Sequence, residues 1–238
     1  MFKYLFFFLV CVMEYQTSPM KWCESIYYYS DYIAEFWNTL TSLFFTFLPL
    51  YCYLDMKVRN ISIRKKFNIR SLLFLFSLIG PTSFLFHLTL NFYAQFFDEI
   101  SIIVFLIYCL KKIFKLSFYY FYTVSFLFIL VSYFYPFISP FFLLTLGSSL
   151  VITTKKQIKK DSISSKLWDK GYYYGIFAIF LWLFDFVCYF NTHSWWHIFI
   201  AYSSYHFLLV VINETCFSDE EKKKFTIVNK FFPYIDEC

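Results

Sequence analysis

Charged residues are scarce in this sequence. Asp, Glu, Lys and Arg make up 16% of the 238 residues, hydrophobic residues make up 60%, and the mean hydropathy is +0.56. A water-soluble domain carries about 25% charged and about 45–50% apolar residues, because it must cover its core with polar surface. The composition therefore excludes an ordinary soluble domain and predicts an integral membrane protein.

Two further absences narrow the function. None of the seven cysteines lies in a CxxC pair, which argues against a metal site built from thiolates. The net charge is +5, but the basic residues fall in short clusters between apolar runs instead of being interleaved on one face. A nucleic-acid partner is therefore not indicated, and the bilayer is the expected surrounding.

Long apolar runs predict membrane-spanning helices, since a helix satisfies its backbone hydrogen bonds internally. We expect an all-α fold, a bundle of seven transmembrane helices. The expected spans are Asp31–Leu54, Ser71–Leu90, Glu99–Leu110, Leu116–Tyr135, Pro136–Thr154, Gly171–Phe190 and Ser194–Cys216. The third is short, and only the Tyr135-Pro136 break separates the fourth from the fifth, so six or eight spans are the alternatives.

The positions of Lys and Arg predict the orientation, because cytoplasmic loops retain these residues. With seven spans, nineteen of the twenty-one fall on one side: six within 57–70, three within 111–115, six within 155–170 and four within 222–230. Only Lys3 and Lys21 fall on the other side. This places the N-terminus in the lumen or outside and the C-terminus in the cytosol.

This orientation divides the chain into three parts. Residues 1–18 carry one lysine and an apolar run, which is typical of a signal peptide or of an N-terminal lumenal segment. Residues 19–216 form the seven-span domain, and residues 217–238 form a cytosolic tail. The tail ends in no retrieval signal that would name an organelle.

Polar residues within the expected spans are functional candidates, because burying them in lipid is costly. His193 and His197 lie four residues apart and share a helix face, as do Ser83 and His87. Alternating spans bring these residues and Asp98 to the same lumenal depth. Three histidines match a catalytic zinc site, and a carboxylate and a hydroxyl supply a proton acceptor and an oxyanion donor. The His193/His197 pair alone could equally be interfacial histidines beside an aromatic belt.

Two more polar residues lie in the last two spans. Asp185 is a carboxylate inside the sixth span; it either holds a ligand histidine in its tautomer or is satisfied by a neighbouring helix. His206 lies nine residues beyond His197, about half a turn off its face, so we expect it to be a packing residue.

These motifs resemble the alkaline ceramidase family, part of a superfamily of seven-span zinc hydrolases that also contains the progestin and adiponectin receptors. The likeness is carried by Trp22-Cys23-Glu24, Tyr32–Thr39, Ser83–Thr89, Gln95–Glu99 and His193–His197. The first two stretches favour ceramidases over the receptors.

The resemblance implies an N-acylsphingosine amidohydrolase of the endoplasmic reticulum or Golgi membrane, which cleaves the membrane lipid ceramide to sphingosine and a fatty acid. It assigns the zinc (Zn2+) to His87, His193 and His197, makes Asp98 the base that activates water at the zinc, and makes Ser83 the oxyanion partner. The alternatives are a lipid-sensing receptor-like protein and an inactive relative. The oligomeric state is not predicted.

The family's calcium (Ca2+) site is altered in this sequence. The corresponding positions are Lys21, Trp22, Glu24, Ile26 and Glu35, where the family has an aspartate at the first and an asparagine at the fourth. Calcium takes about six to eight oxygen ligands, so the loss of two predicts weak binding at best. We expect the Lys21 ammonium to replace the ion and to bridge Glu24 and Glu35.

The resemblance also implies a disulfide between Cys23 and Cys188. Both cysteines are expected on the lumenal side, where disulfides persist.

Overall fold

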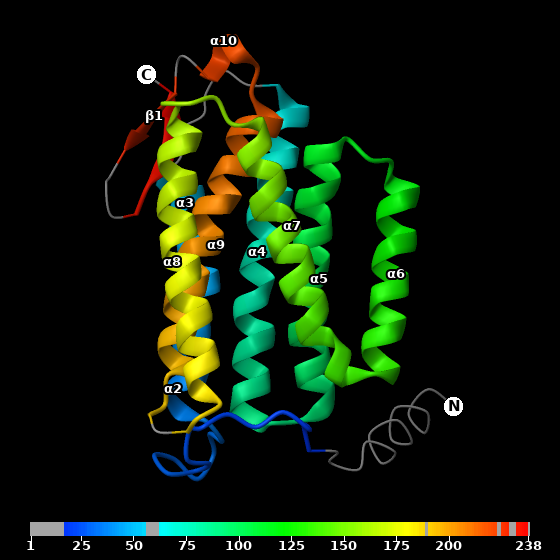
Figure 1. Ribbon diagram of the computed structural model, residues 1–238, viewed down its shortest axis with the longest axis vertical. Helices are drawn as coiled ribbons and strands as arrows, with labels where there is room; N and C mark the ends of the chain where they lie inside the picture. Colours follow the sequence, from blue (N-terminus) through cyan, green and yellow to red (C-terminus); the bar gives the residue numbers. More distant parts are fainter. Residues whose placement is uncertain (1–16, 56–61, 189, 223–224, 229–231, 238) are drawn as a thin grey trace.

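The fold is a bundle of long helices that run side by side in the computed structural model (Figure 1). The structure describes residues 17–55, 62–188, 190–222, 225–228 and 232–237. Its helices are α2 (Phe36–Ser42), α3 (Phe44–Asp55), α4 (Ile63–Thr89), α5 (Phe92–Phe114), α6 (Phe118–Phe134), α7 (Ser139–Gln157), α8 (Ile163–Asp185), α9 (His193–Cys216) and α10 (Asp219–Lys222), with a 3-10 turn η1 (Pro136–Ile138) before α7. The expected helical fold class is confirmed for this bundle. Most of the expected leader, residues 1–18, lies outside the described residues.

Among the described residues, four helical segments are long and apolar enough to cross a membrane, which makes the chain a multi-pass membrane protein. They are Ile63–Thr89, Phe92–Phe114, Pro136–Gln157 and His193–Cys216, and Phe118–Phe134 is a shorter apolar helix. The expected break between the fourth and fifth spans is confirmed, because α6 ends at Phe134 and Pro136 begins η1.

Two expected span boundaries differ from the structure. The third span is not short: α5 begins at Phe92, where the Asn91 side chain accepts a hydrogen bond from the Tyr93 amide at 2.8 Å. Asp98 and Glu99 therefore lie within this helix. Both are buried in the bundle, so these two polar residues do not mark the start of the helix. The region expected to form the first span begins its helix only at Phe36 and contains two helices, α2 and α3, instead of one.

Small residues allow two pairs of helices to approach closely, as is common where helices pack in lipid. A Cβ added at Gly80 of α4 would lie 2.1 Å from the Thr46 hydroxyl of α3. A Cβ at Gly175 of α8 would lie 2.8 Å from the Ser203 hydroxyl of α9, which donates to the Gly171 carbonyl at 2.7 Å. These contacts fix α4 and α9, the two helices that carry the histidines, within the bundle.

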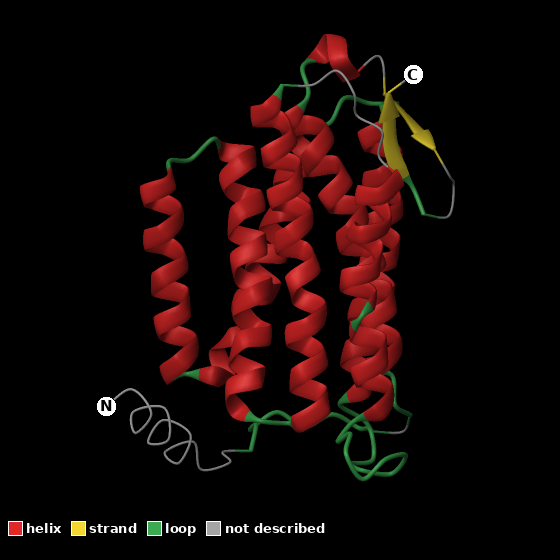
Figure 2. Cartoon of the chain, turned by 180° about the vertical axis from the view of Figure 1, so that it is seen from behind, coloured by secondary structure: helices red, strands yellow, loops and turns green. Residues whose placement is uncertain are grey.

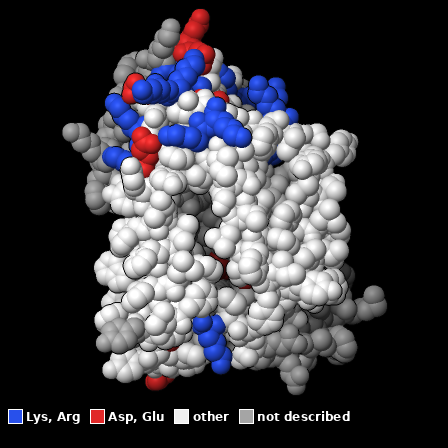
Figure 3. Space-filling view, in the orientation of Figure 1, with Lys and Arg blue, Asp and Glu red and all other residues white. Residues whose placement is uncertain are grey.

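The two ends of the bundle differ in charge. In Figure 3, Lys and Arg side chains gather at the end that carries α10, whereas the middle of the face shows almost no charged side chains. At the charged end Lys65 pairs with Glu221 at 2.5 Å, and Lys222 pairs with Glu214 at 2.6 Å. Such segregation is what a bilayer around the apolar middle requires.

A small hairpin covers part of the charged end (Figure 2). Strands β1 (Phe225–Val228) and β2 (Tyr234–Glu237) pair antiparallel, so the described part of the tail is not wholly helical. The buried Tyr205 of α9 donates its hydroxyl to the Pro233 carbonyl at 2.6 Å, which holds the hairpin against the bundle.

At the opposite end, residues 17–35 lie across the ends of the helices as an irregular segment (Figure 1). The Ser18 amide donates to the Leu90 carbonyl at 2.8 Å, and the Glu35 amide donates to the His87 carbonyl at 3.0 Å. These bonds fasten the segment to the end of α4, so the segment lies directly against the histidine cluster.

Candidate active site

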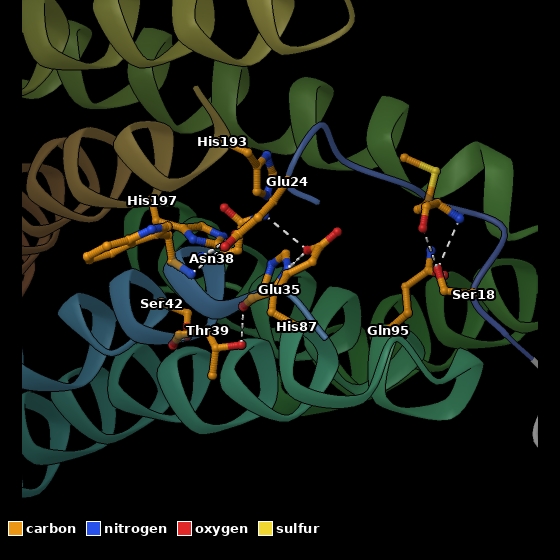
Figure 4. Close-up of polar contacts among 12 residues, drawn as sticks. Ser18, Glu24, Glu35, Asn38, Thr39, Ser42, His87, Gln95, His193 and His197 are labelled. Atoms are coloured by element: carbon orange, nitrogen blue, oxygen red, sulfur yellow. Dashed lines mark hydrogen bonds and ion pairs between the residues drawn. The ribbon is translucent and has the colours of Figure 1, made fainter. Parts of the chain in front are cut away.

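Three histidines from two helices meet at the end of the bundle that residues 17–35 cover. His87 lies in the last turn of α4, and His193 and His197 lie in the first turns of α9. Each is 1% exposed, and their ligand atoms all lie within 4.8 Å of one another. Figure 4 shows the three side chains gathered beside Glu24 and Glu35. The group could hold a metal ion.

Neighbouring side chains hold two of the three rings. The Nδ1 atom of His87 lies 2.6 Å from the Glu35 carboxylate, and Nδ1 of His197 lies 3.1 Å from the Thr41 hydroxyl. An outer partner of this kind fixes the ring orientation, and a carboxylate also favours a proton on Nδ1 and a lone pair on Nε2. The His87 ring is thereby prepared to be a metal ligand.

The third ring is held by stacking. The His193 imidazole lies face to face with the Trp22 indole, with ring centroids 3.6 Å apart. Its Nδ1 atom has no hydrogen-bond partner among the described residues. Trp22 adjoins Cys23, which the structure joins to Cys188 as a disulfide, with the two Cα atoms 5.1 Å apart. The bridge therefore ties the stacked tryptophan to the segment between α8 and α9.

Asp185 acts on the backbone and not on a histidine ring. It is the last residue of α8, so it does not lie well inside a span. Its Oδ1 atom accepts hydrogen bonds from the amides of Thr192 and His193, both at 3.0 Å, and Oδ2 accepts one from the Cys23 amide at 3.2 Å. Of the two alternatives for Asp185, these contacts match the second, a carboxylate satisfied by a neighbouring helix, and not the first, a partner of a ligand ring. Asp185 binds the otherwise unpaired amides at the start of α9, which positions the helix that carries two histidines.

The expected ion pair of Lys21 is also wrong. Lys21 is exposed, and neither Glu24 nor Glu35 lies within ion-pair distance of its ammonium group. Ile26, at the other altered calcium position, is 49% exposed. The physical reason is that both carboxylates are buried, and both oxygens of Glu24 and Oε2 of Glu35 have partners inside the protein, while Lys21 stays in the exposed part of the segment.

Glu24 instead binds the start of α2. Its two oxygens accept hydrogen bonds from the amides of Trp37 at 2.6 Å and Asn38 at 2.9 Å. Burial raises the pKa of this carboxyl, and the two amides oppose that rise by stabilising the charged form. The Asn38 side chain in turn donates to Glu35 at 3.0 Å, so Glu24 helps to place the residue that contacts His87.

Ser83 and Asp98 lie beside the histidines on the wall of a large cavity. Both are buried, and the Ser83 side chain lies near the Asp98 carboxylate. The Oδ1 atom of Asp98 has no hydrogen-bond partner among the described residues, so it can accept a proton or a hydrogen bond from a bound molecule. The two residues that the sequence predicts for catalysis therefore share one wall with the predicted ligands.

The cavity has a volume of about 480 Å³ and extends from the histidines into the apolar interior. Its deeper walls come largely from α7, α8 and α9, as with Leu143, Ile176 and Phe207. Figure 3 shows the face of the molecule hollowed between α7 and α8, with acidic atoms visible at the bottom of the hollow. Asp98 and Glu99 are the acidic residues among the described ones that line the cavity. A molecule can thus reach them from the side of the bundle.

Sequence reasoning assigned no catalytic or ligand-holding role to Thr41 and Glu99, and it placed Glu35 only in the altered calcium region. The sequence did contain a signal for Thr41, because Asn38-Thr39-Leu40-Thr41-Ser42 is a polar run within an expected apolar span. His206 is buried and its ring bonds the Tyr202 carbonyl at 2.8 Å, apart from the three-histidine group, which agrees with a packing role.

The fold and the site define a multi-pass helical membrane protein in which a buried histidine cluster opens into an apolar cavity. A family model described as Ceramidase matches residues 14–236, and the chain belongs to this family.

Curated relatives agree with the family. Alkaline ceramidase 1 of Mus musculus is 40% identical over 93 residues, which cover 39% of this chain and 33% of the relative. Alkaline ceramidase 1 of Homo sapiens is 39% identical over 93 residues, covering 39% of this chain and 34% of the relative. The matched region thus spans about a third of the length of these two proteins. Alkaline ceramidase of Drosophila melanogaster is 25% identical over 230 residues, covering 82% of this chain and 76% of the relative.

Proposed function

We propose that this protein is a zinc-dependent amidohydrolase that cleaves ceramide to sphingosine and a fatty acid. The observation that carries the proposal is the meeting of three buried histidines, Asp98 and Ser83 at one end of an apolar cavity, in a member of the ceramidase family. The relatives' printed name, alkaline ceramidase, agrees with this substrate.

The donor set fits zinc. Three imidazoles with an open fourth position are a common ligand set of catalytic zinc. His87, His193 and His197 would hold the ion, and the contacts of Glu35 and Thr41 with Nδ1 leave Nε2 of two rings available. When bound, zinc polarises the carbonyl and lowers the pKa of water.

Asp98 and Ser83 would carry out the proton and charge transfers. Asp98 takes a proton from the attacking water and can then deliver it to the leaving nitrogen of sphingosine. The Ser83 hydroxyl donates a hydrogen bond to the amide oxygen as negative charge develops on it. Because both side chains are buried, these interactions are stronger than they would be in water.

The cavity would hold a lipid chain. Its volume of about 480 Å³ is within the range of about 300–1,000 Å³ that ligand pockets occupy, and its walls are mainly apolar. The hollow between α7 and α8 would let an amphiphilic substrate enter sideways from the bilayer (Figure 3).

We further propose a topology of seven spans, with α2 and α3 counted as one interrupted span. The cation-rich end with α10 would face the cytosol, and residues 17–35 with the histidines would face the lumen of the endoplasmic reticulum or Golgi. Residues 19–216 then form the membrane domain and residues 217–238 the cytosolic tail.

The test is fatty-acid release from a panel of ceramides by detergent-purified protein, with zinc quantified in the same samples. His197→Ala should lose zinc and activity together. His206→Gln replaces a buried histidine outside the cluster and should keep both. Wild-type protein that holds zinc but cleaves no ceramide would overturn the proposal in favour of a lipid sensor or an inactive relative.

A further inference from the structure

A second carboxylate lies in the cavity beside Asp98. Glu99 is buried on α5 and lines the cavity, and Gln95 Nε2 donates to its Oε1 atom at 2.6 Å. Ser18 in turn donates to Gln95 Oε1 at 2.6 Å, a contact drawn in Figure 4. Glu99 is therefore held at one oxygen by a hydrogen-bond chain that starts in the N-terminal segment.

The proposed amide hydrolysis assigns no role to Glu99. The attack needs one proton acceptor and one oxyanion donor, and Asp98 and Ser83 fill these roles in the proposed function. Burying a second carboxylate next to the first is costly unless polar groups bind it. A carboxylate accepts about four hydrogen bonds, so the bond from Gln95 leaves capacity for a ligand.

The chemistry of the substrate matches this capacity. In ceramide, the carbon that bears the amide nitrogen is flanked by two carbons that carry hydroxyl groups. A hydroxyl bound by Glu99 would lie close to an amide placed at Asp98, because both side chains line the same cavity. A buried group that binds a substrate hydroxyl rejects analogues that lack it, since it is then left unpaired.

We propose that Glu99 is a specificity-determining residue that binds the hydroxyl groups of the sphingoid base. This inference rests on the proposed function and deepens it. Glu99 makes the site select hydroxylated sphingoid amides over simple fatty amides, while Asp98 serves the reaction itself.

A purely structural role for Glu99 makes a different prediction. In that case the chain from Ser18 through Gln95 to Glu99 would serve only to fasten the N-terminal segment, and breaking either end would have the same effect. Ser18→Ala breaks the far end and is a matched control, because Ser18 is not among the residues that line the cavity. Glu99→Gln removes the charge but keeps an oxygen that can accept from Gln95.

The experiment compares two substrates that differ only in the hydroxyls: N-stearoyl dihydrosphingosine and the N-stearoyl amide of 2-aminooctadecane. For Glu99→Gln we expect kcat/KM on the first to fall about 10- to 100-fold, with little change on the second and unchanged zinc content, because a hydrogen bond to a charged group is lost. Ser18→Ala should keep the wild-type ratio between the substrates. If Glu99→Gln loses activity equally on both substrates, so that the ratio of their kcat/KM values stays that of the wild type, the inference is overturned.

Binding separates this inference from the proposed hydrolysis. Trp22, Trp182 and Trp196 line the cavity, so quenching of tryptophan fluorescence reports occupancy without turnover. If the wild type binds both lipids but cleaves neither, the proposed function fails, while the effect of Glu99→Gln on the ratio of the two Kd values still decides the inference. A ratio equal to that of the wild type refutes it.

Discussion

Glu35 offers a sharp test of how the site is organised. Its Oε2 atom lies 2.6 Å from Nδ1 of His87 and 3.0 Å from Nδ2 of Asn38, and the residue is 1% exposed. Glu35→Ala leaves a buried imidazole without its outer partner. Loss of such a partner typically weakens metal binding about 10- to 100-fold. This corresponds to about 1.4 to 2.7 kcal/mol.

The assay is competition for zinc between the detergent-purified protein and a chelator of known affinity. Glu35→Gln should lose less affinity than Glu35→Ala, because the amide oxygen can still accept from Nδ1. Thr41→Val removes the 3.1 Å contact with His197 and should weaken zinc binding as well. Glu221→Gln changes a carboxylate at the opposite end of the bundle and should leave zinc affinity unchanged.

The refuting result is a folded Glu35→Ala protein whose zinc affinity stays within about twofold of the wild type, a change too small for the loss of an outer-shell partner. It would mean that Glu35 does not prepare His87 for the metal. Folding is checked by the thermal unfolding midpoint of the metal-free protein, so that a general loss of structure is not mistaken for a weakened site.

Three further predictions concern the scaffold and the cavity. Asp185→Asn should lower the thermal unfolding midpoint and the zinc content, because a charged acceptor for two amides at the start of α9 is lost, worth about 1.5–3 kcal/mol per bond; an unchanged midpoint would contradict this. Cys188→Ser should lower the midpoint under non-reducing conditions by removing the bridge to Cys23, and dithiothreitol should then have no further effect, whereas equal midpoints for variant and wild type would count against a stabilising bridge. Gly147 lines the cavity, and a Cβ there meets nothing within 4 Å, so Gly147→Phe should fold and should shift activity toward ceramides with shorter chains. The control Thr145→Phe changes an exposed residue of α7 outside the cavity lining, and a chain-length profile shared by both variants would show that the cavity does not hold the chain.

Local periodicity explains what could be predicted for the site. Residues four apart on a helix share a face, so the sequence alone paired Ser83 with His87 and His193 with His197. The alternation of spans then predicted that these faces lie at one depth, and the structure brings the histidines within 4.8 Å. Neither step needs knowledge of how the helices pack.

The contacts made by residues 17–35 could not be predicted in this way. Whether Lys21 reaches Glu24 or Glu35 depends on the path of an irregular segment, and periodicity says nothing about that path. The structure turns Lys21 to the exterior and directs both carboxylates inward to amides and to a histidine. The expected ion pair rested only on opposite charges. It failed because the buried carboxylates contact amides and a histidine inside the protein.

The sequence by itself determined a helical membrane protein and the three histidines that meet in one buried group, because composition and helical spacing depend only on the order of residues. The tertiary structure alone decided that Glu35 contacts His87 across 52 residues, that Asp185 binds the start of α9, and that Glu99 faces the cavity. These contacts join elements distant in the chain, and only the packing of the helices fixes their distances.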